Sequence, residues 1–182
     1  MPDTENKTVV TRITYLELAQ RLEYTLPVPA GVRLAIMRAS DMPLHFYRYL
    51  YTQVGKDYNW WSRASVSDEE LAAFIHSEDT EIHVLYVNGS PAGFCELNLK
   101  NLSDHVELVY FGLIGDFHGR GLSRFFLSEA LSAAWLHEPQ KLKLQTCSLD
   151  SPKALQLYQR MGFTATAWRE EEVPYHHESS QQ

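Results

Sequence analysis

A glycine-rich segment, residues 114–123, lies in the middle of the chain between two apolar stretches. Glycines between a strand and a helix let consecutive backbone N–H groups face outward, and the first turn of a helix carries unpaired donors and partial positive charge. Such a segment binds anions, phosphate in particular. The residues expected to form this anion site are His118, Gly119, Arg120, Gly121, Leu122 and Ser123.

Two common phosphate motifs do not fit this segment. The Walker pattern requires Gly-Lys-Ser/Thr after a longer loop, and the dinucleotide fingerprint follows the first strand of a βαβ unit. Glycine motifs are permissive, so the spacing alone gives equal weight to phosphate binding and to a loop that merely turns the chain.

Two glutamates in apolar stretches are candidate proton acceptors. Glu107 interrupts the apolar run 105–113, where a carboxylate is costly unless it is paired or faces a wet cleft. Such surroundings raise a carboxyl pKa towards the working pH, which suits a general base. A buried Glu107 held by a structural arginine is an equal alternative. Glu96 is the reserve base or a contact for a cationic substrate, and it should be salt-bridged if it packs under a helix.

Trp60 and Trp61 are adjacent aromatic residues between the first two expected helices. Two tryptophans in a loop could clamp an aromatic or cationic group of a substrate. Such residues more often cap a hydrophobic core. We expect the core role for one of them and leave the other open as a substrate contact.

Hydrophobic periodicity predicts the elements that position these residues. Asn88-Gly89 indicates a hairpin, Ser67 with Glu70 indicates a helix start, and the apolar run 105–113 indicates a central strand. The expected helices cover residues 41–51, 67–76, 122–135 and 151–161, and the expected strands cover 8–18, 32–37, 81–87, 92–99, 105–113, 141–148 and 163–171. The pattern predicts an α/β (α+β) fold with a single mixed, mostly antiparallel twisted sheet flanked by helices.

The chain of 182 residues is the size of one domain. We expect an N-terminal extension over residues 1–31 with a possible extra strand, a domain over residues 32–173, and a flexible tail over residues 174–182. The extra strand could complete the sheet within a monomer or across a homodimer.

The composition excludes several function classes. A net charge of −7 argues against nucleic acid or an anionic membrane as the main partner, because both select for positive charge. The two cysteines lie in apolar stretches, no zinc pattern is present, and no stretch approaches a membrane span. We expect a cytoplasmic protein without a metal.

Two segments resemble the GNAT superfamily of N-acetyltransferases, and the resemblance covers residues 32–173. In that family a central strand is followed by Gln/Arg-x-x-Gly-x-Gly/Ala, and residues 118–123 are similar, with His118 in place of Gln/Arg and Ser123 in place of Gly/Ala. Residues 151–163 resemble the family segment Asn-x-x-Ala-x-x-x-Tyr-x-x-x-Gly-Phe, with Ser151 in place of Asn. Gly121 and Tyr158 match their family positions.

The resemblance implies an enzyme that moves an acetyl group from acetyl-CoA to a primary amine of a small molecule or peptide by direct attack. It places the coenzyme diphosphate on the amides of residues 118–123 and the pantetheine arm along the main chain of Phe111, Gly112 and Leu113. It places Tyr158 beside the coenzyme sulfur, where a tyrosine hydroxyl can protonate the departing thiolate. A non-catalytic acyl-CoA-binding sensor with the same fold is the alternative.

Overall fold

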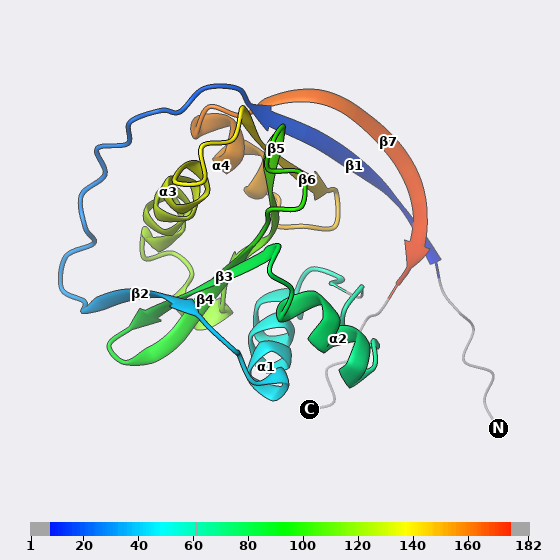
Figure 1. Cartoon of the computed structure of the whole chain (residues 1–182), viewed down its shortest axis with the longest axis horizontal. Helices are drawn as coiled ribbons and strands as arrows, with labels where there is room; N and C mark the ends of the chain where they lie inside the picture. Colours follow the sequence, from blue (N-terminus) through cyan, green and yellow to red (C-terminus); the bar gives the residue numbers. More distant parts are fainter. Residues whose placement is uncertain (1–7, 61, 176–182) are drawn as a thin grey trace.

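The computed structural model describes residues 8–60 and 62–175, which form one seven-stranded sheet with helices on both faces (Figure 1). The strand order is β2-β3-β4-β5-β6-β1-β7. The strands are β1 Thr8–Leu18, β2 Leu34–Ala39, β3 Thr80–Val87, β4 Ser90–Asn98, β5 His105–Leu113, β6 Lys141–Cys147 and β7 Thr164–Pro174. The helices are α1 Leu44–Gly55, α2 Asp68–Ile75, α3 Leu122–Trp135 and α4 Ala154–Arg160, with a 3-10 turn η1 at Gly115–Phe117.

Every neighbouring pair of strands is antiparallel except β5 and β6, which are parallel. This mixed, mostly antiparallel sheet confirms the fold class expected from the sequence. Local signals are confirmed as well. Ser67 and Glu70 form the capping box of α2, and Asn88 and Gly89 turn β3 into β4 with φ of 51° and 87°. None of the helices within the described residues is long and apolar enough to cross a membrane.

The N-terminal strand β1 is an internal strand of the sheet. It pairs with β6 on one side and with β7 on the other. Residues 19–33 then pass around the outside of α3 and α4 before β2 begins, as the blue segment in Figure 1 shows. On this path the Tyr24 hydroxyl donates to the Met161 carbonyl at 2.6 Å. Residues 8–18 therefore join β7 to the rest of the sheet.

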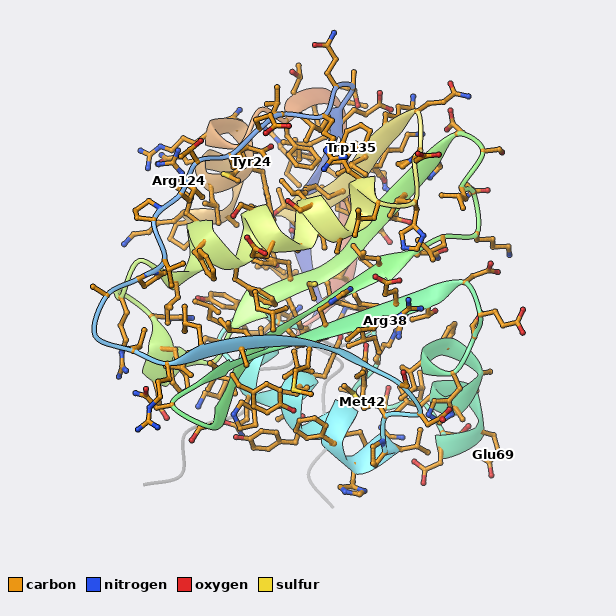
Figure 2. The ribbon with its side chains drawn as sticks, turned by 60° about the vertical axis from the view of Figure 1, so that its left-hand side comes forward. Tyr24, Arg38, Met42, Glu69, Arg124 and Trp135 are labelled. Atoms are coloured by element: carbon orange, nitrogen blue, oxygen red, sulfur yellow. The ribbon has the colours of Figure 1, made fainter. Side chains whose placement is uncertain are left out.

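Two hydrophobic cores lie on opposite faces of the sheet. Figure 2 shows α3, with Trp135 at its far end, on one face and α2, with Glu69, on the other. The first core packs leucines of β1, β5 and β6 against α3 and α4. The second core packs α1 and α2 against β3 and β4, and is rich in aromatic rings. The sheet is thus covered by helices on both sides around β4 and β5.

A buried ion pair joins the second core to the sheet. Glu96 of β4 is 2% exposed. Its carboxylate forms an ion pair with Nη2 of Arg63 at 2.7 Å and accepts a hydrogen bond from the Tyr47 hydroxyl at 2.7 Å. Burial raises the pKa of the Glu96 carboxyl, while the Arg63 guanidinium and the Tyr47 hydroxyl act against that shift. The Arg63 guanidinium also lies 5.1 Å from the centre of the Tyr110 ring. Arg63 therefore fixes the segment between α1 and α2 against β4 and β5.

Removing the cation of this pair should destabilise the fold. Arg63→Met leaves the Glu96 carboxylate buried without its charge partner, and we expect the free energy of unfolding to fall by about 3–5 kcal/mol. Urea denaturation measures the change. Arg12→Met is the matched control, because its partner Glu170 is 55% exposed, and it should cost about 1 kcal/mol or less. Equal losses in the two variants would contradict the structural role of Arg63.

Shortening a buried side chain of β1 should also destabilise the fold. Leu16 is 1% exposed and lies opposite Leu144 of β6, so Leu16→Ala should lower the free energy of unfolding by about 2–5 kcal/mol. Val10 lies on the same strand and is 63% exposed, so Val10→Ala should change it by about 0.5 kcal/mol or less. Urea denaturation of both variants is the measurement. A small effect of Leu16→Ala would show that β1 is not integral to the sheet.

Candidate functional site

The site begins where β5 and β6 stop pairing. Their parallel register ends at Leu108 opposite Leu144, and the next β6 residues, 145–147, pair with β1 on the other side. The Ile114 N–H donates to the Ala92 carbonyl of β4 at 2.8 Å. Because successive amides of a strand point to opposite edges, the N–H groups of Leu113 and Phe111 point away from β4, into the gap. The end of β5 thus offers main-chain donors towards β6.

A cavity of about 1090 Å³ occupies this gap. One half is lined by the end of β5, the start of α3 and helix α4. The other half is lined by the end of α1 and the segment after it, together with β1 and β7. A cavity of this size holds a ligand larger than most drug-sized molecules.

The glycine-rich segment forms the entrance of α3. Gly119 and Gly121 have φ of 73° and 74°, a left-handed conformation that glycine adopts without strain. No side chain caps α3, so none competes for the first N–H groups of the helix. The His118 ring donates from Nε2 to the Leu113 carbonyl at 3.0 Å and so ties the segment to the end of β5. This geometry suits a phosphate group.

Most residues of the expected anion site reach the cavity, and Arg120 does not. His118, Gly119, Gly121 and Ser123 line it, whereas the side chain of Leu122 is buried in the core. The Arg120 guanidinium lies 5.3 Å from the centre of the Phe117 ring, and Arg120 is not a lining residue.

Three basic residues that the sequence analysis missed line the same half of the cavity. These are Arg124, Lys153 and Arg160, and Figure 2 shows Arg124 at the start of α3. The signal for Arg124 was its position in the first turn of α3, on the cavity side of the glycine-rich segment. Their charges supply the local attraction for an anion that the net charge of the whole chain lacks.

Tyr158 of α4 lines the cavity beside the end of β5. Its ring packs at 6.5 Å from Phe111 and at 6.2 Å from Phe163, centre to centre, and the residue is 8% exposed. Burial raises the pKa of the Tyr158 hydroxyl above its ordinary value, and the negative charge of Asp150 raises it further. The hydroxyl is therefore held in its protonated form, as a proton donor requires.

The structure does not bring the two candidate glutamates to the cavity. Glu96 is held by Arg63 and is not a lining residue, which fits the structural alternative stated for a glutamate under a helix. Glu107 is half-buried on β5, one residue before the cavity wall begins at Leu108, and it is also not a lining residue. Within the described residues no ion pair holds Glu107. Neither carboxylate is in contact with the space where a substrate would react.

Aromatic rings form the wall of the second half of the cavity. Trp60 lies 5.4 Å from Tyr51 and 5.1 Å from Tyr110, centre to centre, and the Ser62 hydroxyl is 2.6 Å from that of Tyr110. Trp60 is thus both part of the second core and a lining residue. Trp61, the other candidate substrate contact, lies outside the described residues.

Comparisons with known proteins agree with this geometry. A family model described as an acetyltransferase (GNAT) domain matches residues 50–174. A GCN5-related N-acetyltransferase from Sphaerobacter thermophilus is 17% identical with a TM-score of 0.62, and the match covers 91% of this chain and 53% of that one. A GCN5-related N-acetyltransferase from Kribbella flavida is 15% identical with a TM-score of 0.60, and the match covers 94% of this chain and 62% of that one.

The spermidine/spermine N-acetyltransferase SpeG from Vibrio cholerae is 21% identical with a TM-score of 0.55, and the match covers 72% of this chain and 80% of that one. The chain spans about half to two thirds of the length of the two GCN5-related structures. A comparison with curated proteins found no match. These solved structures share the fold of this chain. The family model matches more than half of the sequence, and the matched residues include most of those that line the cavity. The chain therefore belongs to the GNAT acetyltransferase family.

Proposed function

We propose that the protein transfers an acetyl group from acetyl-CoA to a primary amine of a small molecule or peptide. The observation that carries the proposal is the free main-chain edge of β5, which leads directly to the glycine-rich segment at the start of α3. An extended amide-containing arm can pair with such an edge, and a diphosphate can bind at the helix start beyond it.

The proposal assigns the first half of the cavity to the coenzyme. The diphosphate would accept hydrogen bonds from the amides of residues 119–123, and Arg124, Lys153 and Arg160 would attract the phosphates of the nucleotide. The pantetheine arm would lie along Phe111, Gly112 and Leu113. One N–H there would polarise the thioester carbonyl as negative charge develops on its oxygen.

Tyr158 is proposed as the acid. A tyrosine hydroxyl that stays protonated can donate to the thiolate as the carbon–sulfur bond breaks. Reference pKa values of about 10 and about 8.5 make that transfer uphill, and the raised pKa of Tyr158 adds to the cost, so a hydrogen bond from the hydroxyl to the sulfur must be in place before the bond breaks. Holding amine and thioester together supplies a larger share of the barrier, roughly 7–11 kcal/mol in well-oriented reactions. Direct attack within one ternary complex is therefore sufficient.

The second half of the cavity is assigned to the acceptor. The rings of Trp60, Tyr51 and Tyr110 favour a cationic or aromatic amine. Polyamines are the named substrates of one structural neighbour, and they fit this description. The negative net charge favours a cationic amine over nucleic acid or a membrane as the partner. We further propose that the protein acts in the cytoplasm, as a monomer or a homodimer.

Coenzyme binding depends on the backbone of the α3 entrance. Gly121→Ala forces a side chain onto a residue with φ of 74° and places its methyl group where the ligand would lie, so affinity for acetyl-CoA should fall at least about tenfold. Gly31→Ala is the control, with φ of 78° and equally open surroundings. Both variants should lose about 1–2 kcal/mol of stability. Calorimetric titration showing equal affinity in the two would argue against the site.

Loss of the Tyr158 hydroxyl should affect turnover more than binding. Tyr158→Phe should lower kcat by about 100-fold or more and leave the dissociation constant of acetyl-CoA within about threefold. Thiol release from acetyl-CoA over a panel of primary amines measures kcat. Acetyl-CoA binding without turnover of any amine by the unmodified protein would instead support a non-catalytic sensor.

A further inference from the structure

Two carboxylates line the cavity among the described residues, Asp150 and Glu171. Glu171 of β7 is paired with Arg169 on the same strand, with Oε2 at 2.7 Å from Nη2. Asp150 follows β6, and within residues 8–60 and 62–175 no lysine or arginine nitrogen lies within ion-pair distance of it. Among the residues that the structure describes, Asp150 is therefore the cavity carboxylate without a lysine or arginine partner.

Three neutral donors hold the Asp150 carboxylate in one orientation. Oδ2 accepts from the Thr146 hydroxyl at 2.7 Å and from the Cys147 N–H at 2.9 Å. Oδ1 accepts from Nε1 of Trp60 at 3.3 Å. A carboxylate has about four acceptor positions, so one remains for a further donor. The hydrogen bond from Trp60 joins the aromatic wall to the residue that follows β6. A ligand that donates to the remaining position of Asp150 would therefore lie close to the Trp60 ring.

Asp150 and Tyr158 act in the same part of the cavity. Both line it, and the negative charge of Asp150 contributes to the raised pKa of the Tyr158 hydroxyl. Tyr158 in turn packs beside Phe111, at the edge of β5 assigned to the thioester. If a thioester bound at that edge, the Tyr158 hydroxyl would lie near its sulfur. The Asp150 carboxylate would lie on the side of the attacking nitrogen, near Trp60.

We propose that Asp150 binds the ammonium group of the acceptor and removes the protons that its nitrogen must lose. The inference rests on the proposed function and identifies its acceptor as a cationic primary amine. A carboxylate that is bonded to Trp60, in a cavity also lined by Tyr51 and Tyr110, recognises both the charge and the apolar face of such a group.

The proton balance of the step is complete. The ammonium first loses one proton to Asp150, which passes it to solvent. The neutral amine then forms the carbon–nitrogen bond, the carbon–sulfur bond breaks, the nitrogen gives a second proton to Asp150, and Tyr158 gives its proton to the sulfur. The proton on Asp150 finally moves to the Tyr158 phenolate, a downhill transfer because a phenolate is a much stronger base than a carboxylate. Amide, thiol and one released proton are the products.

The test compares acceptors that differ in charge. Phenethylamine, tryptamine and spermidine are cationic near neutral pH. Hydroxylamine is neutral there, so it needs neither a partner for an ammonium charge nor the first proton removal, and the proton that it loses after attack leaves a strongly acidic nitrogen and can pass to water. Asp150→Asn should lower kcat/KM for the best of the three amines by about 100-fold or more, with KM raised. The rate with hydroxylamine, corrected for the uncatalysed reaction, should change less than about fivefold. The loss with the amine should shrink as pH rises, because solution then supplies neutral amine.

Three further variants make the result specific. Asp150→Glu keeps the charge and should recover at least about tenfold of the loss. Glu107→Gln removes the competing base on β5 and should lower kcat/KM less than about threefold. Glu69→Gln removes an exposed carboxylate on α2 that does not line the cavity, and should change nothing. Thermal unfolding and acetyl-CoA titration confirm that each variant is folded and binds coenzyme.

Several outcomes would overturn the inference. Equal losses with hydroxylamine and with the cationic amine would make Asp150 merely structural. An unchanged rate in Asp150→Asn, or a large loss in Glu107→Gln instead, would assign the proton acceptor elsewhere while leaving the proposed acetyl transfer intact. Failure of the unmodified protein to acetylate any of the four probes would overturn the proposed function and this inference together.

Discussion

The separation of β5 from β6 after Leu108 is the constraint on which the rest of the site depends. Beyond that point β6 continues alongside β1, whereas β5 keeps only its pairing with β4. The register of β4 and β5 shifts between Glu96 and Leu97, which leaves Val109 as an extra residue on β5. Beyond this bulge the N–H groups of Phe111 and Leu113 face the cavity, and the proposed binding of the thioester depends on that edge.

The surrounding elements keep the gap open and chemically distinct on its two sides. Arg63 and Glu96 fix the aromatic segment after α1 on one side of β5, and His118 ties the start of α3 to its end. Arg124, Lys153 and Arg160 lie with α3 and α4, and Arg169 of β7 is paired with Glu171. The aromatic rings lie with α1 and the segment after it, and Asp150 lies at the end of β6. A phosphate-bearing donor and a cationic acceptor are thus attracted to opposite ends of one cavity.

Local sequence signals predicted most elements, because each depends on neighbours in the chain. The apolar run before Gly112 and the glycine before Leu122 predicted β5 and α3 with the bounds that the structure has. The place of β1 between β6 and β7 was not predictable, because it depends on pairing across more than a hundred residues. The partner of Glu96 was hidden for the same reason, since Arg63 comes from a separate loop. No sequence pattern singles out Asp150, because the absence of a cation beside it among the described residues depends on segments that are distant in the chain.

The central claim is that the edge of β5 receives an acyl-CoA, and amide hydrogen exchange at Phe111 and Leu113 tests it most directly. An amide that donates to bound pantetheine is withdrawn from water, so saturating acetyl-CoA should slow exchange at one or both of these residues by at least about tenfold. Unchanged exchange at both residues, in protein shown by calorimetry to be saturated with acetyl-CoA, would contradict the account.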